Sequence, residues 1–339
     1  MLAKYVVING IRDVSVTERE IHPDHLKPTE CFLETRVSFI SAGTELSRVF
    51  GLKKGATYPA YPGYCSVGKL LKKGEDIYQA EEGDIVLFSG PHASRQIYDY
   101  TKSDGGILYK LHKDTAPEEG AFLMMCWIAM NGILPADVKL GDTCVVMGLG
   151  NLGLIVSLLY KQMGVKVIAI DPMKHRAALA RQMGIEHVVD CAPENQVEAV
   201  MALTGGRGAD IAVDASGLSV CVETCIKAAA KYGQVLLLGS PRTDYTTNVT
   251  PSFNAIHTKM LTVTGALNRR YPFEEKEGSR LSIKRSMQYL EGLLQQKTID
   301  VNKFISHTIK PTAEELLLAY DGLMNKKDVF TGVLIDWRV

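Results

Sequence analysis

Several features are missing from this sequence, and each absence narrows the possible function. No run of apolar residues approaches membrane-spanning length, and the chain does not begin with the charged, apolar and cleavage segments of a secretory leader. Neither sign of charge is in excess, because 38 basic residues balance 38 acidic ones, and no long basic run occurs. Nucleic acids and membrane surfaces are therefore not indicated as partners, and we expect a cytoplasmic protein.

The cysteine spacings that signal a metal site or a disulfide framework are missing as well. The seven cysteines are scattered and odd in number, and none forms a Cys-x-x-Cys pair. Cys126 and Cys144 lie within apolar runs. We expect nearly all seven to be small apolar residues in a reducing compartment.

The most informative motif that is present is a glycine fingerprint. Residues 143–147 are apolar or favour strands, and Gly148, Gly150 and Gly153 follow directly. In such a motif the first glycine permits a tight turn, the second leaves room for a pyrophosphate, and the third allows close packing of the next helix. The helix start then presents free N–H groups to phosphate, so we expect Asn151 and Leu152 to take part in binding.

An acidic residue at the expected distance strengthens this interpretation. A second apolar run, 165–170, ends in Asp171, whose carboxylate can accept both hydroxyls of a ribose. The same charge repels a 2′-phosphate, which predicts NAD in preference to NADP. Lys174, His175 and Arg176 can weaken that preference, although we expect them to be solvated residues in the first turn of a helix. Arg176 is also a candidate contact of the cofactor.

The 339 residues are enough for two domains, and their texture changes along the chain. From Val37 to about Gly120, short apolar runs alternate with Gly and Pro, which indicates a small, partly closed β-barrel. Residues 118–134 then predict a helix, and strands and helices alternate from there to Leu267. Strands are expected at 143–147, 165–170, 187–190, 210–213, 234–238 and 261–264.

This alternation predicts an α/β fold with a doubly wound parallel sheet. We expect a dinucleotide-binding domain at 124–267, inserted between 1–123 and 268–339, which together form the substrate domain. The active site is expected in the cleft between the two domains, at the carboxyl ends of the strands.

The order of these motifs resembles the medium-chain dehydrogenase/reductase family, which includes zinc-type alcohol, sorbitol and threonine dehydrogenases and their zinc-free relatives. The residues that carry the resemblance are the glycine fingerprint and the segments 40–46, 61–68, 83–86, 213–217 and 237–240. It implies a GroES-like barrel for the substrate domain and adds Ser216, Gly239 and Ser240 to the expected cofactor contacts. The combination Ser41-Ala42-Gly43-Thr44-Glu45 with Pro62-Gly63-Tyr64 is similar to a branch of bacteriochlorophyllide dehydrogenase-like proteins.

The sequence departs from the zinc members of that family at the metal ligands. The resemblance places zinc ligands at positions that here hold Ala42, Tyr64 and Met124, with Cys65 as the one remaining candidate. Zinc needs three protein ligands and a water, so we expect no metal. The lobe that holds a structural zinc is missing too, because residues 88–109 contain no cysteine.

Without zinc, side chains must take the proton of the substrate hydroxyl. Thr44 matches the family's proton-relaying hydroxyl and is our first choice, with capping of the next helix as the alternative. Tyr64, His92 and Glu45 are the other catalytic candidates, although Tyr64 also suits packing and His92 a surface loop. Trp127 and Asn131 are candidates for the substrate pocket, with core packing as the alternative for Trp127.

The sequence thus predicts an NAD-dependent oxidoreductase that interconverts a secondary alcohol and a ketone on a polar small molecule such as a sugar, polyol or cyclitol. A zinc-free quinone or enoyl reductase and a non-catalytic nucleotide-binding protein are the alternatives. An exposed edge at 261–264 favours a homodimer or homotetramer.

Overall fold

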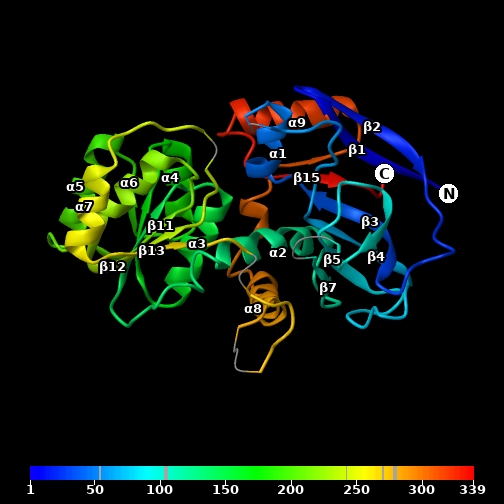
Figure 1. The fold of residues 1–339 in the computed structure, drawn as a ribbon, viewed down its shortest axis with the longest axis horizontal. Coiled ribbons are helices and arrows are strands. Elements are labelled where there is room, and N and C mark those ends of the chain that lie inside the picture. The colour runs from blue at the N-terminus through cyan, green and yellow to red at the C-terminus, as the bar shows by residue number, and fades with distance from the viewer. Residues whose placement is uncertain (53–54, 103–105, 242, 269–270, 278–280) are drawn as a thin grey trace. The chain divides into compact units, whose positions relative to one another are not determined.

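The computed structural model describes residues 1–52, 55–102, 106–241, 243–268, 271–277 and 281–339. They form two compact units (Figure 1). The central unit is Cys126–Arg270, and the terminal unit combines Met1–Met125 with Tyr271–Val339. Within the described ranges, no helix is both long and apolar enough to cross a bilayer.

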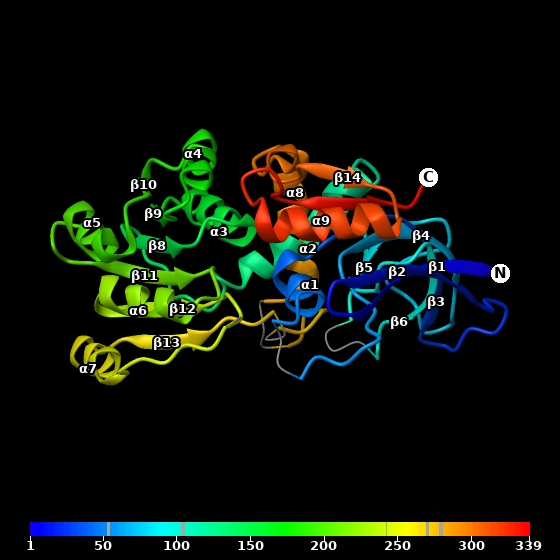
Figure 2. The same cartoon turned by 90° about the horizontal axis from the view of Figure 1, so that it is seen from above.

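The central unit is built on a six-stranded parallel sheet in the order β10-β9-β8-β11-β12-β13. This is the strand order of a Rossmann fold, and Figure 2 shows the strands in that sequence. The strands are β8 (Thr143–Met147), β9 (Lys166–Ile170), β10 (His187–Val189), β11 (Ala209–Asp214), β12 (Ala229–Leu237) and β13 (Thr262–Gly265). The helices are α3 (Asn151–Gln162), α4 (Lys174–Gln182), α5 (Gln196–Leu203), α6 (Ser219–Ala228) and α7 (Thr250–Lys259), with a 3₁₀ turn at Pro193–Asn195.

The predicted doubly wound sheet is confirmed, and the reason is visible in its burial. All five residues of β8 are buried, as a strand covered on both faces requires. The helix α3 packs on β8 and β9, while α6 packs on β8, β11 and β12. Strand β12 begins five residues earlier than expected. The sequence pattern did not reveal this start, because Lys231, Tyr232 and Gly233 interrupt the apolar run.

The terminal unit holds a mixed, mainly antiparallel sheet in the order β14-β15-β3-β4-β5-β7, with β6 also paired to β3. Its strands are β3 (Glu30–Phe39), β4 (Ser66–Lys73), β5 (Ile85–Phe88), β6 (Arg95–Asp99), β7 (Leu108–Lys110), β14 (His307–Ile309) and β15 (Val333–Asp336). A hairpin, β1 (Leu2–Gly10) and β2 (Asp13–Glu20), forms a second sheet. The helices are α1 (Ala42–Val49), α2 (Pro117–Met130, which continues into the central unit), α8 (Ile283–Gln295) and α9 (Ala313–Asn325), with a 3₁₀ turn at Val301–Lys303.

The expected barrel is therefore open in its hydrogen bonding, since the described strands pair along a path with two ends. A hydrophobic cluster beneath the hairpin joins α1 to α9, which lie side by side in Figure 1. Leu46 of α1, Tyr320 of α9 and Ile8 of β1 belong to this cluster. This packing fixes the start of α1, which carries the candidate catalytic residues.

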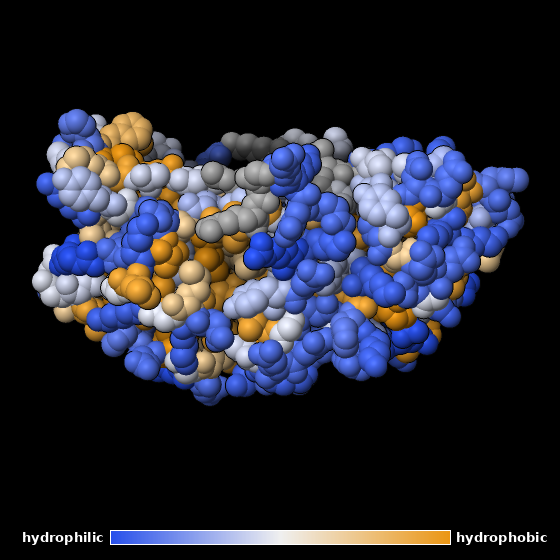
Figure 3. Space-filling model, turned by 90° about the horizontal axis from the view of Figure 1, so that it is seen from below, coloured by the Kyte–Doolittle hydropathy of each residue, from blue (hydrophilic) through white to orange (hydrophobic). Residues whose placement is uncertain are grey.

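The face seen in Figure 3 differs between the units. Hydrophobic residues gather on the unit that contains the parallel sheet, and the terminal unit shows mainly hydrophilic ones. Among the exposed apolar side chains of the central unit, Phe253, Met260 and Val263 lie on α7, just after it, and on the edge strand β13. Exposed apolar surface of this kind is typical of contact regions.

Candidate active site

The glycine turn has the geometry that dinucleotide binding requires. Gly148 has a φ of 89°, and a Cβ added at Gly153 would lie 1.7 Å from the carbonyl oxygen of Gly148. The helix α3 can therefore approach the turn only without a side chain at Gly153. A Cβ added at Gly150 would meet no atom within 4 Å, so this position faces open space.

Asp171, at the end of β9, is buried and anchors the same turn. One carboxylate oxygen accepts a hydrogen bond of 2.8 Å from the N–H of Leu149, and the other accepts one of 2.9 Å from the N–H of Met173. The carboxylate thus lies beside the glycine turn. The sequence predicted its role toward a ribose but not its bond to Leu149, which joins two segments 22 residues apart.

Arg176 lies in the first turn of α4, as expected, but it is only partly solvated. Its guanidinium lies 3.3 Å from the carboxylate of Asp171, and its side chain is 27% exposed. Lys174 is exposed, as expected, and pairs with Asp190. His175 is half-buried, and its Nε2 has no hydrogen-bond partner.

A second turn lies next to Gly148. The N–H and hydroxyl of Ser216 both donate to the buried carboxylate of Asp214, and a Cβ at Gly148 would come within 2.9 Å of the Ser216 Cβ. A Cβ at Gly239 would lie 2.2 Å from the nitrogen of Gly217, while Ser240 is exposed. Asn151 and Leu152 are partly buried at the start of α3.

In the terminal unit, three hydroxyl groups meet at the start of α1. Ser41 is the N-cap of this helix, yet its hydroxyl makes no capping bond and instead shares a hydrogen bond with the phenol of Tyr64. The hydroxyl of Thr44 also interacts with Tyr64, and Thr44 is exposed. Burial raises the pKa of Tyr64, and the charges of Cys65 and Glu45 raise it further, so the phenol stays protonated at neutral pH.

Ser41 is the member of this set that sequence reasoning missed. Helix capping is the alternative role expected for Thr44, but the structure places Thr44 inside the helix and Ser41 at the cap. The available signal was a serine immediately before the helix, which is a common N-cap residue.

Glu45, one residue after Thr44, lies almost fully buried beneath these hydroxyls. Its carboxylate accepts hydrogen bonds from the N–H of Ser41 at 2.7 Å and from the phenol of Tyr320 at 2.7 Å. The Nε2 of His92 lies 3.1 Å from the same carboxylate oxygen as Tyr320. Three hydrogen-bond partners therefore surround one buried carboxylate and fix its position.

His92 is not on an open loop, contrary to the expectation. Its ring is fully buried, and both nitrogens have partners: Nε2 with Glu45, and Nδ1 with the hydroxyl of Ser38 at 2.8 Å. The indole N–H of Trp337 donates to the same hydroxyl at 2.9 Å. Because His92 is enclosed in this way, it is not exposed to a substrate.

The residues at the family's zinc positions do not fit a zinc ion. Ala42 has no ligand atom, Met124 is a buried thioether, and the phenol of Tyr64 is already hydrogen-bonded. Burial, and then the charge of Glu45, raises the pKa of Cys65 well above its usual range, whereas zinc binding needs a thiolate. Over the part of the chain that the structure describes, no group of three His, Cys, Asp or Glu residues is arranged to hold a metal.

Trp127 and Asn131 lie in the central unit, and both are buried. The amide nitrogen of Asn131 donates to the carbonyl of Trp127 at 2.8 Å. The indole N–H of Trp127 and the amide oxygen of Asn131 have no hydrogen-bond partner. A buried polar atom without a partner costs about 1–3 kcal/mol, so both atoms are suited to meet a ligand or a water molecule.

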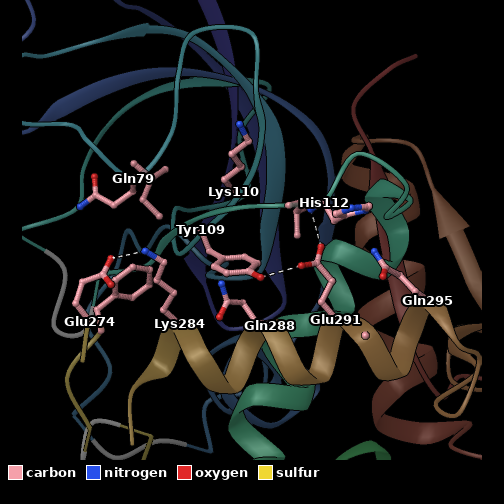
Figure 4. A pocket seen from close by; sticks show the side chains of 13 residues that line it. Gln79, Tyr109, Lys110, His112, Glu274, Lys284, Gln288, Glu291 and Gln295 are labelled. Carbon is pink, nitrogen blue, oxygen red and sulfur yellow. Dashed lines mark hydrogen bonds and ion pairs between the residues drawn. The ribbon is translucent and has the colours of Figure 1, made fainter. Parts of the chain in front are cut away.

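A pocket of about 540 Å³ in the terminal unit contains none of the residues predicted from the sequence. It lies between β7 and α8, and its walls carry Lys110, Lys284 and Gln288 (Figure 4). Its buried charge, Glu291, already accepts hydrogen bonds from the phenol of Tyr109, the hydroxyl of Thr115 and a backbone N–H. We therefore do not place the chemistry there.

The amino-acid sequence is also similar to those of known dehydrogenases. Residues 151–281 match the family model of zinc-binding dehydrogenases. Over 260 residues the chain is 30% identical to an uncharacterized zinc-type alcohol dehydrogenase-like protein of Haemophilus influenzae, covering 69% of this chain and 75% of that protein. The chain belongs to the zinc-type alcohol dehydrogenase-like family.

The chain is also similar to two further proteins, one in sequence and one in fold. It is 30% identical over 179 residues to D-guloside 3-dehydrogenase of Escherichia coli K12, covering 51% of this chain and 49% of that enzyme. Its fold matches the crystal structure of the alcohol dehydrogenase rspB from E. coli CFT073 in complex with NADH, with a TM-score of 0.79, 17% identity and 99% coverage of both chains. The predicted family and fold are therefore confirmed.

Proposed function

We propose that this member of the alcohol dehydrogenase-like family is an NAD-dependent oxidoreductase without catalytic zinc that interconverts a secondary alcohol and a ketone on a sugar, polyol or cyclitol. The observation that carries the proposal is the group of hydroxyls formed by Ser41, Thr44 and Tyr64, in which Tyr64 stands at a position that the resemblance assigns to a zinc ligand. The similarity to a guloside dehydrogenase supports a polyhydroxylated substrate.

The central unit has the residues to hold the cofactor. Open space at Gly150 suits a pyrophosphate against the start of α3, and Asp171 with Arg176 suits the adenosine ribose. Asn151, Leu152, Ser216, Gly239 and Ser240 complete the proposed contacts. NAD, when bound, accepts or returns the hydride.

The terminal unit supplies the groups that transfer the hydroxyl proton of the substrate. The exposed hydroxyl of Thr44 contacts the reacting oxygen of the substrate and exchanges its proton with Tyr64. In alcohol oxidation, Thr44 takes the hydroxyl proton of the substrate and gives its own to Tyr64, Tyr64 gives its own to Ser41, and Ser41 releases its hydroxyl proton to solvent water; ketone reduction runs the same transfers in reverse. The raised pKa of Tyr64 keeps the phenol neutral throughout. Glu45 and His92, the other catalytic candidates, act from beneath this set. Trp127 and Asn131, the candidates for the substrate pocket, are almost fully buried, so their unpaired polar atoms suit a buried water molecule better than direct contact with a substrate.

The choice of NAD over NADP is proposed to depend on the charge of Asp171. The substitution Asp171→Ser should lower affinity for NAD and shift the NADP/NAD affinity ratio toward NADP by about tenfold or more, because a repelling charge is removed. The ratio, measured by fluorescence titration, is the decisive quantity, since loss of the bond to Leu149 weakens both cofactors alike. Equal affinities of the unaltered protein for both cofactors would contradict this role.

Turnover is proposed to need no metal. Protein purified without added metal should contain far less than one zinc per chain, and chelators should leave its activity intact, because Ala42, Tyr64 and Met124 supply no ligand set. Elemental analysis and assays with and without chelator check this. About one zinc per chain together with chelator-sensitive activity would overturn it.

A panel of polyols, sugars and cyclitols assayed with NAD separates the candidate functions. Oxidation of a panel member supports the proposal, whereas reduction of quinones or enoyl compounds with NADPH supports the second enzyme class. Cofactor binding without any turnover would indicate a non-catalytic nucleotide-binding protein.

We also propose that the protein forms a homodimer or homotetramer through the edge of its parallel sheet. Strand β13 is the last strand of that sheet, and Thr262 and Val263 are exposed there. An uncovered strand edge can pair with the same edge of a second copy.

A further inference from the structure

Two residues near the end of the chain belong to the buried network beneath the proposed catalytic hydroxyls. Tyr320, in the middle of α9, is fully buried and donates to Glu45, although the two residues are 275 positions apart. Trp337, just after β15, donates to Ser38. No sequence motif points to either residue.

The network runs from Trp337 to Glu45. The indole N–H of Trp337 donates to the hydroxyl of Ser38, which shares a hydrogen bond with Nδ1 of His92. The other ring nitrogen of His92, Nε2, shares a hydrogen bond with Glu45. Every polar group is satisfied, as a buried network requires.

The network ends at the three proposed catalytic hydroxyls of Ser41, Thr44 and Tyr64, called the catalytic set below. The carboxylate of Glu45 holds the backbone N–H of Ser41, and the hydroxyl of Ser41 holds Tyr64. The orientation of Ser41 therefore depends on where the Glu45 carboxylate points. Tyr320 and His92 are the two side chains that are hydrogen-bonded to this carboxylate from other elements.

We propose that Tyr320 is a positioning residue that, through Glu45, holds Ser41 against Tyr64 for proton transfer. This inference rests on the proposed function for its catalytic part. The substitution Tyr320→Phe should lower kcat about tenfold, a size typical of losing a hydrogen bond to a charged group, and should leave the Kd for NAD unchanged.

Tyr109→Phe provides a matched control within the same unit. Tyr109 is also buried and donates to a buried carboxylate, Glu291, at 2.8 Å, but it lies in the pocket of Figure 4, away from the catalytic set. Both variants should lose similar thermal stability. Only Tyr320→Phe should change kcat.

A measurement that needs no substrate tests the positioning directly. In protein labelled with ¹⁵N-serine, the amide resonance of Ser41 reports its hydrogen bond to Glu45. Tyr320→Phe should shift this resonance, whereas Tyr109→Phe should not.

The outcomes separate the two proposals. An unmoved Ser41 resonance in Tyr320→Phe, or a kcat equal to that of Tyr109→Phe, overturns the inference. If the unaltered protein oxidises no polyol, the proposed function fails while the resonance still decides whether Tyr320 positions Ser41. If Tyr320→Phe does not fold, Trp337→Phe removes the donor at the other end of the network and should give the same shifts in smaller size.

Discussion

Replacing Tyr64 with Phe is expected to lower kcat about a hundredfold or more while affinity for NAD stays nearly unchanged. The substitution keeps the ring and removes only the hydroxyl that joins Thr44 to Ser41. A general acid or base typically contributes about a hundredfold to ten-thousandfold, so loss of the true proton-exchanging group should fall in this range. Steady-state turnover on a polyol substrate and NAD titration measure the two quantities.

Thr44→Val and His92→Ala extend this test. Thr44→Val removes the group proposed to contact the substrate and should lower kcat similarly. His92→Ala removes a buried ring and leaves Glu45 with one hydrogen-bond partner fewer, so it should lower stability as well as kcat. Near-native kcat in all three variants would mean that the proton leaves through water or through another residue.

The pH dependence of ketone reduction follows from the same geometry. Burial raises the pKa of Tyr64, so the neutral phenol that donates the proton persists to a higher pH than an exposed tyrosine would allow. The rate of reduction should therefore stay level through neutral pH and fall only under strongly alkaline conditions.

Gly150→Ala and Gly153→Ala are expected to differ in their effect on stability, although both residues belong to the same glycine fingerprint. Gly150 has a φ of −70°, and its added Cβ would meet no protein atom, so the alanine variant should keep its stability within about 1 kcal/mol. Its affinity for NAD should fall about tenfold or more, because the methyl group occupies the space proposed for the pyrophosphate.

At Gly153 an added methyl group would clash with the backbone of the protein itself. The added Cβ would lie 1.7 Å from the carbonyl oxygen of Gly148, so the turn or α3 must shift, at a cost typically of about 1–3 kcal/mol. This variant should therefore lose both thermal stability and NAD affinity. Thermal unfolding and NAD titration distinguish the pair, and unchanged NAD affinity in Gly150→Ala would contradict the proposed pyrophosphate position.

The sequence predicted the central unit well because its signals are local. Strand β8 matches the expected 143–147 exactly, since a buried strand followed by glycines has a distinctive pattern. The early start of β12 was missed because a polar interruption hid it. In the terminal unit, the sequence indicated strands separated by glycines and prolines but not which strands pair, and the pairing proved to be an open path.

The sequence by itself determined the family, the parallel sheet, the glycine turn with its acidic partner Asp171, and the loss of zinc-ligand residue types. These features depend on residue type and spacing within short segments. The tertiary structure decided which distant side chains meet: it buried His92 against Glu45, paired Arg176 with Asp171, and brought Ser41 and Tyr320 to the proposed site. The physical reason is that packing of separate elements, such as α1 on α9, sets these contacts, and no pattern within either segment encodes the position of the other.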